Sequence, residues 1–213
     1  MNINGMIFDF DGTLADTLPL CIRAFRASVE PRLGRSVSDA EIIATFGPAE
    51  EGTIKALIPD YYDEGVSAYL QHYERFHADY PDLFPGVQSL LTELHERGVK
   101  LALVTGKGER SAVLSLNFYG LTSYFSAFGY GDLEPNSKTR NINRIRADWN
   151  LPPDRVLYVG DALSDILACR KAGVPIASVA WASTAEPELL ASMQPDALFD
   201  TVSAFREWLV QRL

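Results

Sequence analysis

The sequence predicts an α/β protein in which a doubly wound parallel sheet is interrupted by an all-helical insert. Three observations lead to this prediction. The apolar run from Ile3 to Phe10 is typical of a strand that is buried on both faces. No convincing strand pattern occurs from Asp16 to about Pro81, and from Val87 onward strand and helix patterns alternate. The 213 residues are 47% apolar, which is enough for a large domain with an insert.

The insert begins where the strand pattern gives way to helical spacing. Apolar residues from Leu18 to Val29 recur at near-helical intervals, and we expect Pro31 and Gly34 to end that helix. Ser38 followed by Glu41 three residues later is the pattern of a capping box, which predicts the start of a second helix. Two further helices are expected over residues 52–58 and 66–76.

After the insert, the alternating order predicts a parallel sheet whose ligands bind at the carboxyl ends of the strands. The strands after the first are expected over residues 99–105, 125–130, 156–160, 174–181 and 197–199. The helices are expected over residues 87–97, 109–118, 139–149, 164–172, 187–193 and 202–213. The predicted boundaries are residues 1–15 and 83–213 for the α/β core domain and residues 16–82 for the helical domain.

Charge and composition narrow the classes of partner. The net charge of −9 and a pI near 4.8 argue against binding to nucleic acid or to an anionic membrane surface. A protein of this net charge would also repel a phosphorylated substrate, so such a substrate would need a local cation. Cys21 and Cys169 are expected to pack as small apolar residues in a reducing compartment. Because we find neither a signal-peptide pattern nor a membrane-spanning run, we expect a cytoplasmic protein, as a monomer or weak homodimer.

Two carboxylates follow the first predicted strand. Asp9 and Asp11 point the same way because side chains on a strand alternate between its faces. Gly12 then allows a tight turn. Two like charges side by side are unfavourable unless they are compensated, and an oxygen-rich site of this kind suits Mg²⁺. The alternative is an ordinary strand that ends in a polar turn.

Other strand ends carry further candidate residues. Thr105 and Gly106 end a strand with a hydroxyl and free amides that can hold phosphate oxygens, although most strand-end threonines are merely turn residues. Lys138 stands just before a predicted helix, where a lysine is more often solvated surface. Asp161 ends a buried strand and Asp165 follows one helical turn later on the same side. Asp161 could instead simply cap the helix.

Taken together, these motifs resemble those of the haloacid dehalogenase superfamily of phosphatases. The segments that carry the resemblance are Asp9-Phe10-Asp11-Gly12-Thr13, Val104-Thr105-Gly106, Lys138 and Gly160-Asp161-Ala162-Leu163-Ser164-Asp165. They occur in the family's order, and the helical insert resembles the family's small cap domain, so the resemblance covers nearly the whole chain. The overall pattern looks like phosphoglycolate phosphatases and their relatives that act on small phosphomonoesters.

The resemblance implies a role for each residue. Asp9 matches the nucleophile that forms an aspartyl-phosphate, and Asp11 matches the general acid/base. Mg²⁺ would lie between Asp9, the backbone carbonyl of Asp11 and Asp161, with Asp165 supporting the metal site. The phosphoryl oxygens would be held by Thr105, the amide of Gly106 and Lys138. Thr139 follows Lys138 at a position where relatives commonly have proline. If Lys138 is not the family's lysine, Lys107 is the nearest substitute.

Several alternatives stay open within the resemblance. Dehalogenases of the family lack an aspartate at the position of Asp11, so Asp11 favours phosphate-ester hydrolysis. Relatives that cleave phosphonates need a cap lysine that forms an imine, and we see no reason to assign that role to Lys55, the only lysine of the insert. A sugar-phosphate mutase shares all four motifs. The substrate is expected to be a small phosphorylated metabolite, with sugar phosphates, nucleoside monophosphates and pyrophosphate all open. Substrate choice is expected to lie in the turn Phe46-Gly47-Pro48-Ala49-Glu50 and in the basic residues Arg23 and Arg26.

Two alternatives lie outside phosphatase chemistry. Gly106-Lys107-Gly108-Glu109-Arg110-Ser111 is close to a dinucleotide-binding fingerprint, with Asp132 at a tolerable distance for a ribose contact. That pattern leaves the acidic pairs around Asp9 and Asp161 unexplained. A non-catalytic regulator would use the fold only to bind, but all four carboxylates are intact.

Overall fold

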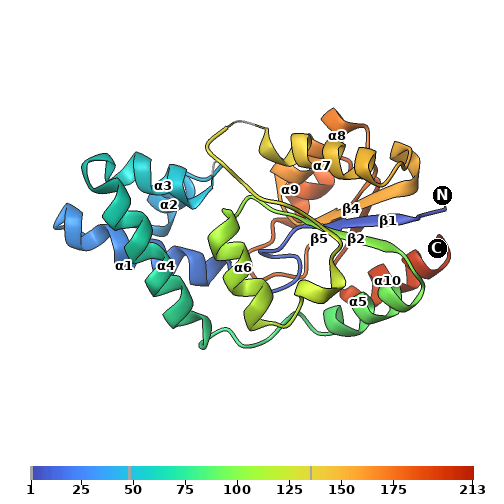
Figure 1. The fold of residues 1–213 in the computed structure, drawn as a ribbon, viewed down its shortest axis with the longest axis horizontal. Helices are drawn as coiled ribbons and strands as arrows, with labels where there is room; N and C mark the ends of the chain where they lie inside the picture. The colour runs from blue at the N-terminus through green and yellow to red at the C-terminus, as the bar shows by residue number, and fades with distance from the viewer. Residues whose placement is uncertain (1, 48, 135) are drawn as a thin grey trace.

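The computed structural model describes residues 2–47, 49–134 and 136–213, and its centre is a sheet of six parallel strands (Figure 1). Their order across the sheet is β3-β2-β1-β4-β5-β6, and every neighbouring pair is parallel. This confirms the predicted doubly wound parallel sheet. The strands are β1 (Gly5–Phe8), β2 (Lys100–Val104), β3 (Ala127–Gly129), β4 (Val156–Gly160), β5 (Ile176–Val179) and β6 (Ala197–Phe199).

Helices cover both faces of the sheet because its strands are apolar on both sides. In β1, Met6 and Phe8 join one buried cluster and Ile7 joins the other. Figure 1 shows α5 and α10 below the sheet and α7, α8 and α9 above it. The helices of this part are α5 (Val87–Glu96), α6 (Glu109–Phe118), α7 (Ser137–Asp148), α8 (Leu163–Ala172), α9 (Pro187–Ser192) and α10 (Val202–Val210).

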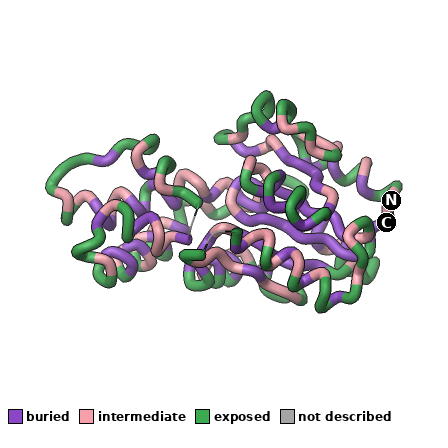
Figure 2. The backbone as a smooth tube through the Cα atoms, turned by 90° about the horizontal axis from the view of Figure 1, so that it is seen from above, coloured by how far each residue is buried: buried purple, intermediate pink, exposed green. Residues whose placement is uncertain are grey.

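The insert forms a separate helical layer with its own apolar core. Figure 2 shows buried residues running through this layer as well as through the sheet. The predicted domain boundaries at residues 15/16 and 82/83 stay a prediction. The helices of the insert are α1 (Leu18–Leu33), α2 (Asp39–Ile43), α3 (Glu50–Leu57) and α4 (Tyr62–His77).

Two details of the insert test the local predictions. Ser38 caps α2, since its Oγ accepts the N–H of Glu41 at 3.2 Å. Pro31 does not end α1, which continues to Leu33 and ends at Gly34 in the left-handed conformation. The ring of proline fixes φ near the helical value, so its position in the last turn removes one hydrogen bond without stopping the helix. Gly34 ends it because glycine adopts positive φ without steric cost.

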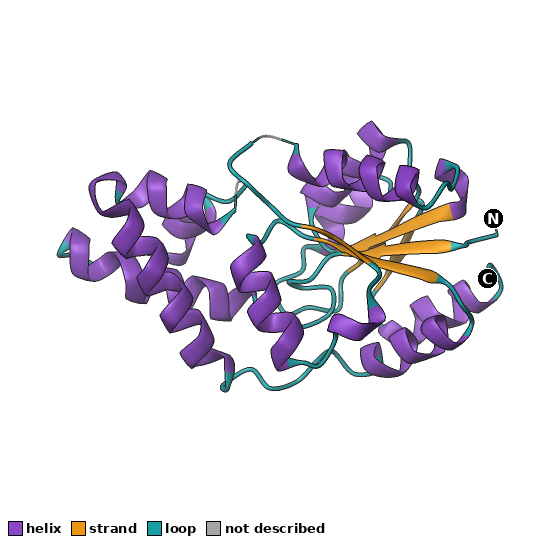
Figure 3. Ribbon diagram, in the orientation of Figure 1, coloured by secondary structure: helices purple, strands orange, loops and turns teal. Residues whose placement is uncertain are grey.

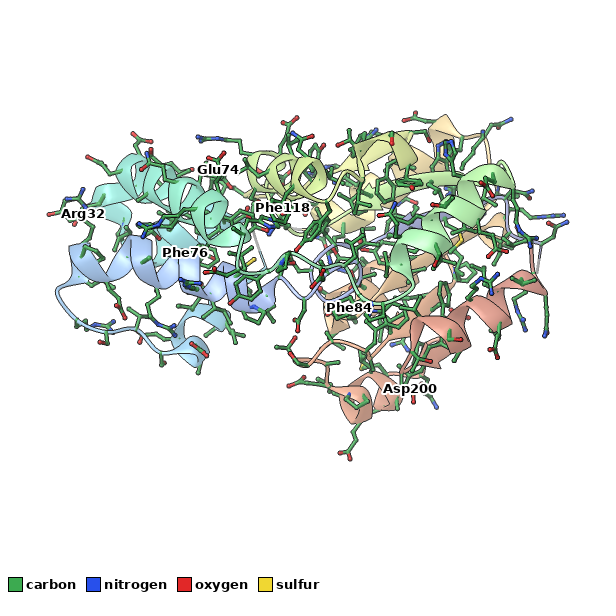
Figure 4. All side chains as sticks on the ribbon, turned by 90° about the horizontal axis from the view of Figure 1, so that it is seen from below. Arg32, Glu74, Phe76, Phe84, Phe118 and Asp200 are labelled. Carbon is green, nitrogen blue, oxygen red and sulfur yellow. The ribbon has the colours of Figure 1, made fainter. Side chains whose placement is uncertain are left out.

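The carboxyl ends of the strands face the helical layer, with loops between the two (Figure 3). Helix α6 of the core also packs against α4 of the insert. Phe118 of α6 lies toward the helical layer (Figure 4), where its ring centroid is 4.2 Å from that of His77. Among the described helices, none combines the length and the apolar character needed to cross a membrane. Because the helical layer packs against the core in this way, the loops at the carboxyl edge lie between two packed layers, where a small molecule can be enclosed.

Candidate active site

Asp9 lies at the carboxyl end of β1 with its side chain almost fully buried. Its backbone N–H donates to the carbonyl of Val159 at 2.9 Å, which continues the β1–β4 ladder to this residue. The Oδ1 atom accepts the N–H of Phe10 at 2.7 Å. Burial, partly offset by Lys138, raises the pKa of Asp9 to about 6. The carboxylate is therefore fixed in place and poorly compensated by its surroundings.

Lys138 reaches the buried carboxylates from the first turn of α7. Its Nζ lies 2.5 Å from Asp9 Oδ2 and 2.6 Å from Asp165 Oδ1. Burial lowers the pKa of Lys138, but the two carboxylates outweigh burial and hold the pKa above its ordinary value. This lysine therefore stays charged beside Asp9, and its predicted role in holding phosphoryl oxygens stays a prediction.

An acidic cluster brings the two ends of the chain together. Oxygen atoms of Asp9, Asp161 and Asp165 all lie within 4.8 Å of one another. Burial, then the charges of Asp9 and Asp165, raises the pKa of Asp161 well above its ordinary value. Three carboxylates share one lysine, so negative charge remains uncompensated. Oxygen donors in this arrangement fit a hard divalent cation such as Mg²⁺, which would supply the missing positive charge.

Gly12 gives the chain room to turn beside Asp161. Its φ is +74°, and a Cβ at this position would lie 2.0 Å from Asp161 Oδ2. Gly12→Ala should displace the Asp161 carboxylate from the acidic cluster, and we expect the affinity of the cluster for a divalent cation to fall by about 10- to 100-fold, the usual cost of disturbing the surroundings of a metal site. A binding titration of the protein with Mg²⁺ measures the effect. Gly34→Ala is the matched control, because Gly34 has φ +65° and open space around it. Equal effects of the two substitutions would contradict the prediction.

Asp11 points away from the acidic cluster. Its Oδ1 accepts a hydrogen bond from Thr17 Oγ1 at 2.6 Å and lies 3.3 Å from Lys107 Nζ. The carboxylate of Asp11 is therefore absent from the cluster of Asp9, Asp161 and Asp165 that could hold a metal ion. Only its backbone carbonyl is available for the metal role that the resemblance implied. The side chain is free to act as an acid or base, with Thr17 and Lys107 fixing its orientation.

One cavity joins most of the predicted site residues. It has a volume of about 430 Å³ and lies between the helical layer and the carboxyl edge of the sheet. Asp165 lies behind its wall, fully buried, and accepts hydrogen bonds from Lys138 and from the Tyr158 hydroxyl at 2.9 Å. The predicted residues that line the cavity are Asp9, Asp11, Thr105, Gly106, Lys138 and Asp161.

The sequence analysis missed a contact between the insert and the core. Glu50, at the start of α3, accepts hydrogen bonds from the Gly108 N–H and the Ser111 hydroxyl at the start of α6. Its Oε1 also lies 3.8 Å from the buried Nζ of Lys107. The only available signal was a lysine directly after a strand-end Thr-Gly pair, because the partner of that lysine is 57 positions away.

The same contact removes the basis for the dinucleotide alternative. The N–H groups at the start of a helix would have to receive the pyrophosphate, but the N–H of Gly108 at the start of α6 already donates to the carboxylate of Glu50. Asp132, the proposed ribose contact, pairs with Arg140. An anionic ligand at this helix would meet a carboxylate that already occupies its place.

Buried carboxylates, a fixed lysine and a cavity at the carboxyl edge of a parallel sheet define an α/β enzyme that acts on an anionic group. Comparison with known proteins then gives the family. Residues 6–179 match the family model of haloacid dehalogenase-like hydrolases, and the chain belongs to this family. It is a hydrolase of the phosphatase type. The resemblance predicted from the motifs is confirmed.

Similar proteins span nearly the full length of the chain. Pyrophosphatase PpaX of Anoxybacillus flavithermus is 31% identical over 209 residues, which cover 95% of each protein. The crystal structure of a predicted phosphoglycolate phosphatase from Haemophilus somnus 129PT superposes with a TM-score of 0.83 at 19% identity, covering 98% of this chain and 99% of the other. A haloacid dehalogenase-like hydrolase from Streptococcus pneumoniae is 25% identical, with a TM-score of 0.79 and coverage of 97% and 98%.

Proposed function

We propose that the protein is a Mg²⁺-dependent phosphatase that hydrolyses a small phosphomonoester through an aspartyl-phosphate on Asp9. The observation that carries this proposal is the position of the Asp9 carboxylate. It lies beside a fixed lysine and within reach of two further carboxylates, on the wall of the cavity. Phosphoryl transfer needs positioning and charge neutralisation above all, and these groups provide both.

In the first step, a carboxylate oxygen of Asp9 attacks the phosphorus atom in line with the leaving oxygen. The bond between phosphorus and the leaving oxygen breaks, and Asp11 donates a proton to that oxygen. In the second step, Asp11 takes a proton from water, whose oxygen attacks the phosphorus and releases phosphate from Asp9. Lys138, the Thr105 hydroxyl and the amide of Gly106 would hold the phosphoryl oxygens. When bound, Mg²⁺ neutralises negative charge on the carboxylates and the phosphoryl group.

The metal ligands of this proposal come from both ends of the chain. Asp9 and Asp161 would bind Mg²⁺ through their carboxylates, and Asp11 through its backbone carbonyl. Asp165 would act behind them, since it accepts the N–H of Ala162 and the hydrogen bonds of Lys138 and Tyr158. Such outer partners fix the orientation of metal ligands.

Hydrolysis of pyrophosphate is a second candidate function. The observation that favours it is the 31% identity with pyrophosphatase PpaX over almost the whole chain. The same nucleophile and acid/base would serve both reactions, because each breaks a P–O bond. The choice between them depends on what the cavity offers to the leaving group. A sugar-phosphate mutase would use the same groups, with a free hydroxyl of a sugar phosphate in place of water as the acceptor of the phosphoryl group.

Removal of the metal is the direct test of the proposed function. Hydrolysis of 4-nitrophenyl phosphate should require Mg²⁺, and chelation with EDTA should lower turnover by about 100-fold or more, because the buried carboxylates then repel the substrate. Added Mg²⁺ should restore turnover. Circular dichroism before and after chelation serves as the control for folding. Full activity after complete removal of divalent metal would contradict the metal-dependent mechanism.

We propose that the protein works in the cytoplasm, as a monomer or weak homodimer, and its two cysteines support a reducing compartment. Both cysteines, Cys21 and Cys169, are buried and unpaired. Burial raises the pKa of the Cys21 thiol to about 12, so this thiol is protonated and inert at neutral pH.

A further inference from the structure

The wall of the cavity opposite the phosphoryl site is apolar and comes from the helical insert. Phe25 stacks on Tyr69 with 4.3 Å between ring centroids, and the ring of Phe46 lies 5.9 Å from that of Phe25. Leu18 adds a further apolar side chain, while the insert's other lining residues are Cys21, Gly47, Glu50 and Thr53. A leaving group in the cavity must therefore lie against aromatic rings, which favour apolar and aromatic partners.

The predicted specificity arginines do not reach this wall. Arg23 pairs with Asp79 at 2.6 Å, and Arg26 pairs with Asp39 and donates to the carbonyl of Val37 at 3.1 Å. Both are absent from the described lining of the cavity, so the structure gives no support to their predicted part in substrate choice, which stays a prediction. Within the predicted turn, Phe46, Gly47 and Glu50 line the cavity, and Pro48 lies outside the described residues.

The cations of the cavity are already committed. Lys138 holds Asp9 and Asp165, and the buried Lys107 lies between Asp11 and Glu50. Among the described lining residues, Lys171 is the one further cation. It is exposed on α8 and donates to Asn136 Oδ1 at 2.6 Å, where water screens its charge. An anionic leaving group would meet the carboxylate of Glu50 and an aromatic wall without a matching cation.

Tyr69 lines the cavity and carries a buried hydroxyl. The side chain is 1% exposed, and its hydroxyl has no hydrogen-bond partner among the described residues. A buried hydroxyl without a partner is unfavourable, so a ligand that supplies one gains affinity. Burial and the nearby Cys21 and Glu50 raise the pKa of Tyr69, so the hydroxyl stays protonated and can donate.

We propose that the substrate is a phosphate monoester of an uncharged aromatic alcohol that carries a hydrogen-bond acceptor for the Tyr69 hydroxyl. This inference rests on the proposed function. It makes both inorganic pyrophosphate and phosphoglycolate poor substrates, since each leaves as an anion toward the side of the cavity that lacks a free cation. The aromatic alcohol leaves as a neutral molecule, because Asp11 gives its oxygen a proton when the P–O bond breaks.

The test compares kcat/KM of the Mg²⁺-loaded enzyme for four substrates: benzyl phosphate, 4-(hydroxymethyl)benzyl phosphate, phosphoglycolate and inorganic pyrophosphate. We expect both benzyl esters to exceed both anionic substrates by about 10-fold or more, the scale on which a pocket discriminates between leaving groups. The hydroxylated ester should exceed the plain one. Tyr69→Phe should bring the ratio of the two benzyl esters close to one.

Two further variants separate the explanations. Phe46→Arg places a cation on the aromatic wall at a partly exposed position, and it should raise the kcat/KM ratio of phosphoglycolate to benzyl phosphate by about 10-fold. Lys171→Gln should leave the order of the four substrates unchanged. A preference of the unaltered enzyme for phosphoglycolate or pyrophosphate would overturn the inference. If Lys171→Gln then lost that preference, Lys171 would be the residue that binds the anion.

The failure of this inference and the failure of the proposed function give different results. If the folded enzyme hydrolyses pyrophosphate or phosphoglycolate faster than the benzyl esters, the phosphatase mechanism stands and the substrate class is wrong. If it hydrolyses none of the four substrates, nor 4-nitrophenyl phosphate, with Mg²⁺ present, the proposed function is wrong and this inference is overturned with it.

Discussion

Asp9→Asn is expected to lower turnover by about 10⁴-fold or more, because an amide cannot replace the carboxylate as the nucleophile. The fold should remain, since the amide has nearly the same shape and its single oxygen can still accept the N–H of Phe10, although its NH2 group cannot accept from Lys138. Lys138 keeps its contact with Asp165. The measurements are kcat for 4-nitrophenyl phosphate and the melting temperature of the variant.

The nucleophile role makes a further demand that a structural role does not. Brief reaction of the unaltered enzyme with a ³²P-labelled aryl phosphate should leave an acid-stable, hydroxylamine-labile label on the protein, and Asp9→Asn should carry none. Asp16→Asn is the matched control, because Asp16 belongs to the same segment but pairs with Ser183 outside the described lining of the cavity. More than a trace of turnover in Asp9→Asn would contradict the role assigned to Asp9.

Lys138→Met is expected to damage both stability and activity. Its removal leaves Asp9, Asp161 and Asp165 together without their lysine, and breaking a buried charge pair costs about 3 kcal/mol or more in free energy of unfolding. Turnover should fall by about 100- to 1,000-fold, the usual cost of losing one donor to a developing charge. Chemical denaturation and steady-state kinetics measure the two effects separately.

Mg²⁺ provides the distinguishing measurement for Lys138. The ion would supply the positive charge that the variant lacks, so Mg²⁺ should raise the melting temperature of Lys138→Met more than that of the unaltered protein. Lys171→Met is the matched control, since Lys171 lines the same cavity but is exposed and touches no carboxylate among the described contacts. A Lys138→Met protein as stable as the Lys171→Met control would show that Lys138 is not needed to balance the cluster.

The sequence predicted the sheet and the acidic residues because both depend on local order. The predicted first strand extends beyond β1 at each end, and the predicted strand over residues 156–160 agrees with β4. In a parallel sheet, the carboxyl ends of neighbouring strands meet at one edge. The pairing of β1 with β4 therefore brings Asp9 and Asp161 together, although 152 positions separate them.

The sequence by itself determined which residues form strands and helices, and which strand ends carry carboxylates, because periodicity and turn residues act over a few positions. Only the tertiary structure decided which partners the long side chains of lysine and arginine contact. In the folded protein, Lys138 pairs with Asp9, and Lys107 lies between Asp11 and Glu50. Arg23 pairs with Asp79 and does not line the cavity. A lysine or arginine can reach several partners from one backbone position. The choice among them follows from burial and nearby charge, which exist only once the helical layer has packed against the sheet.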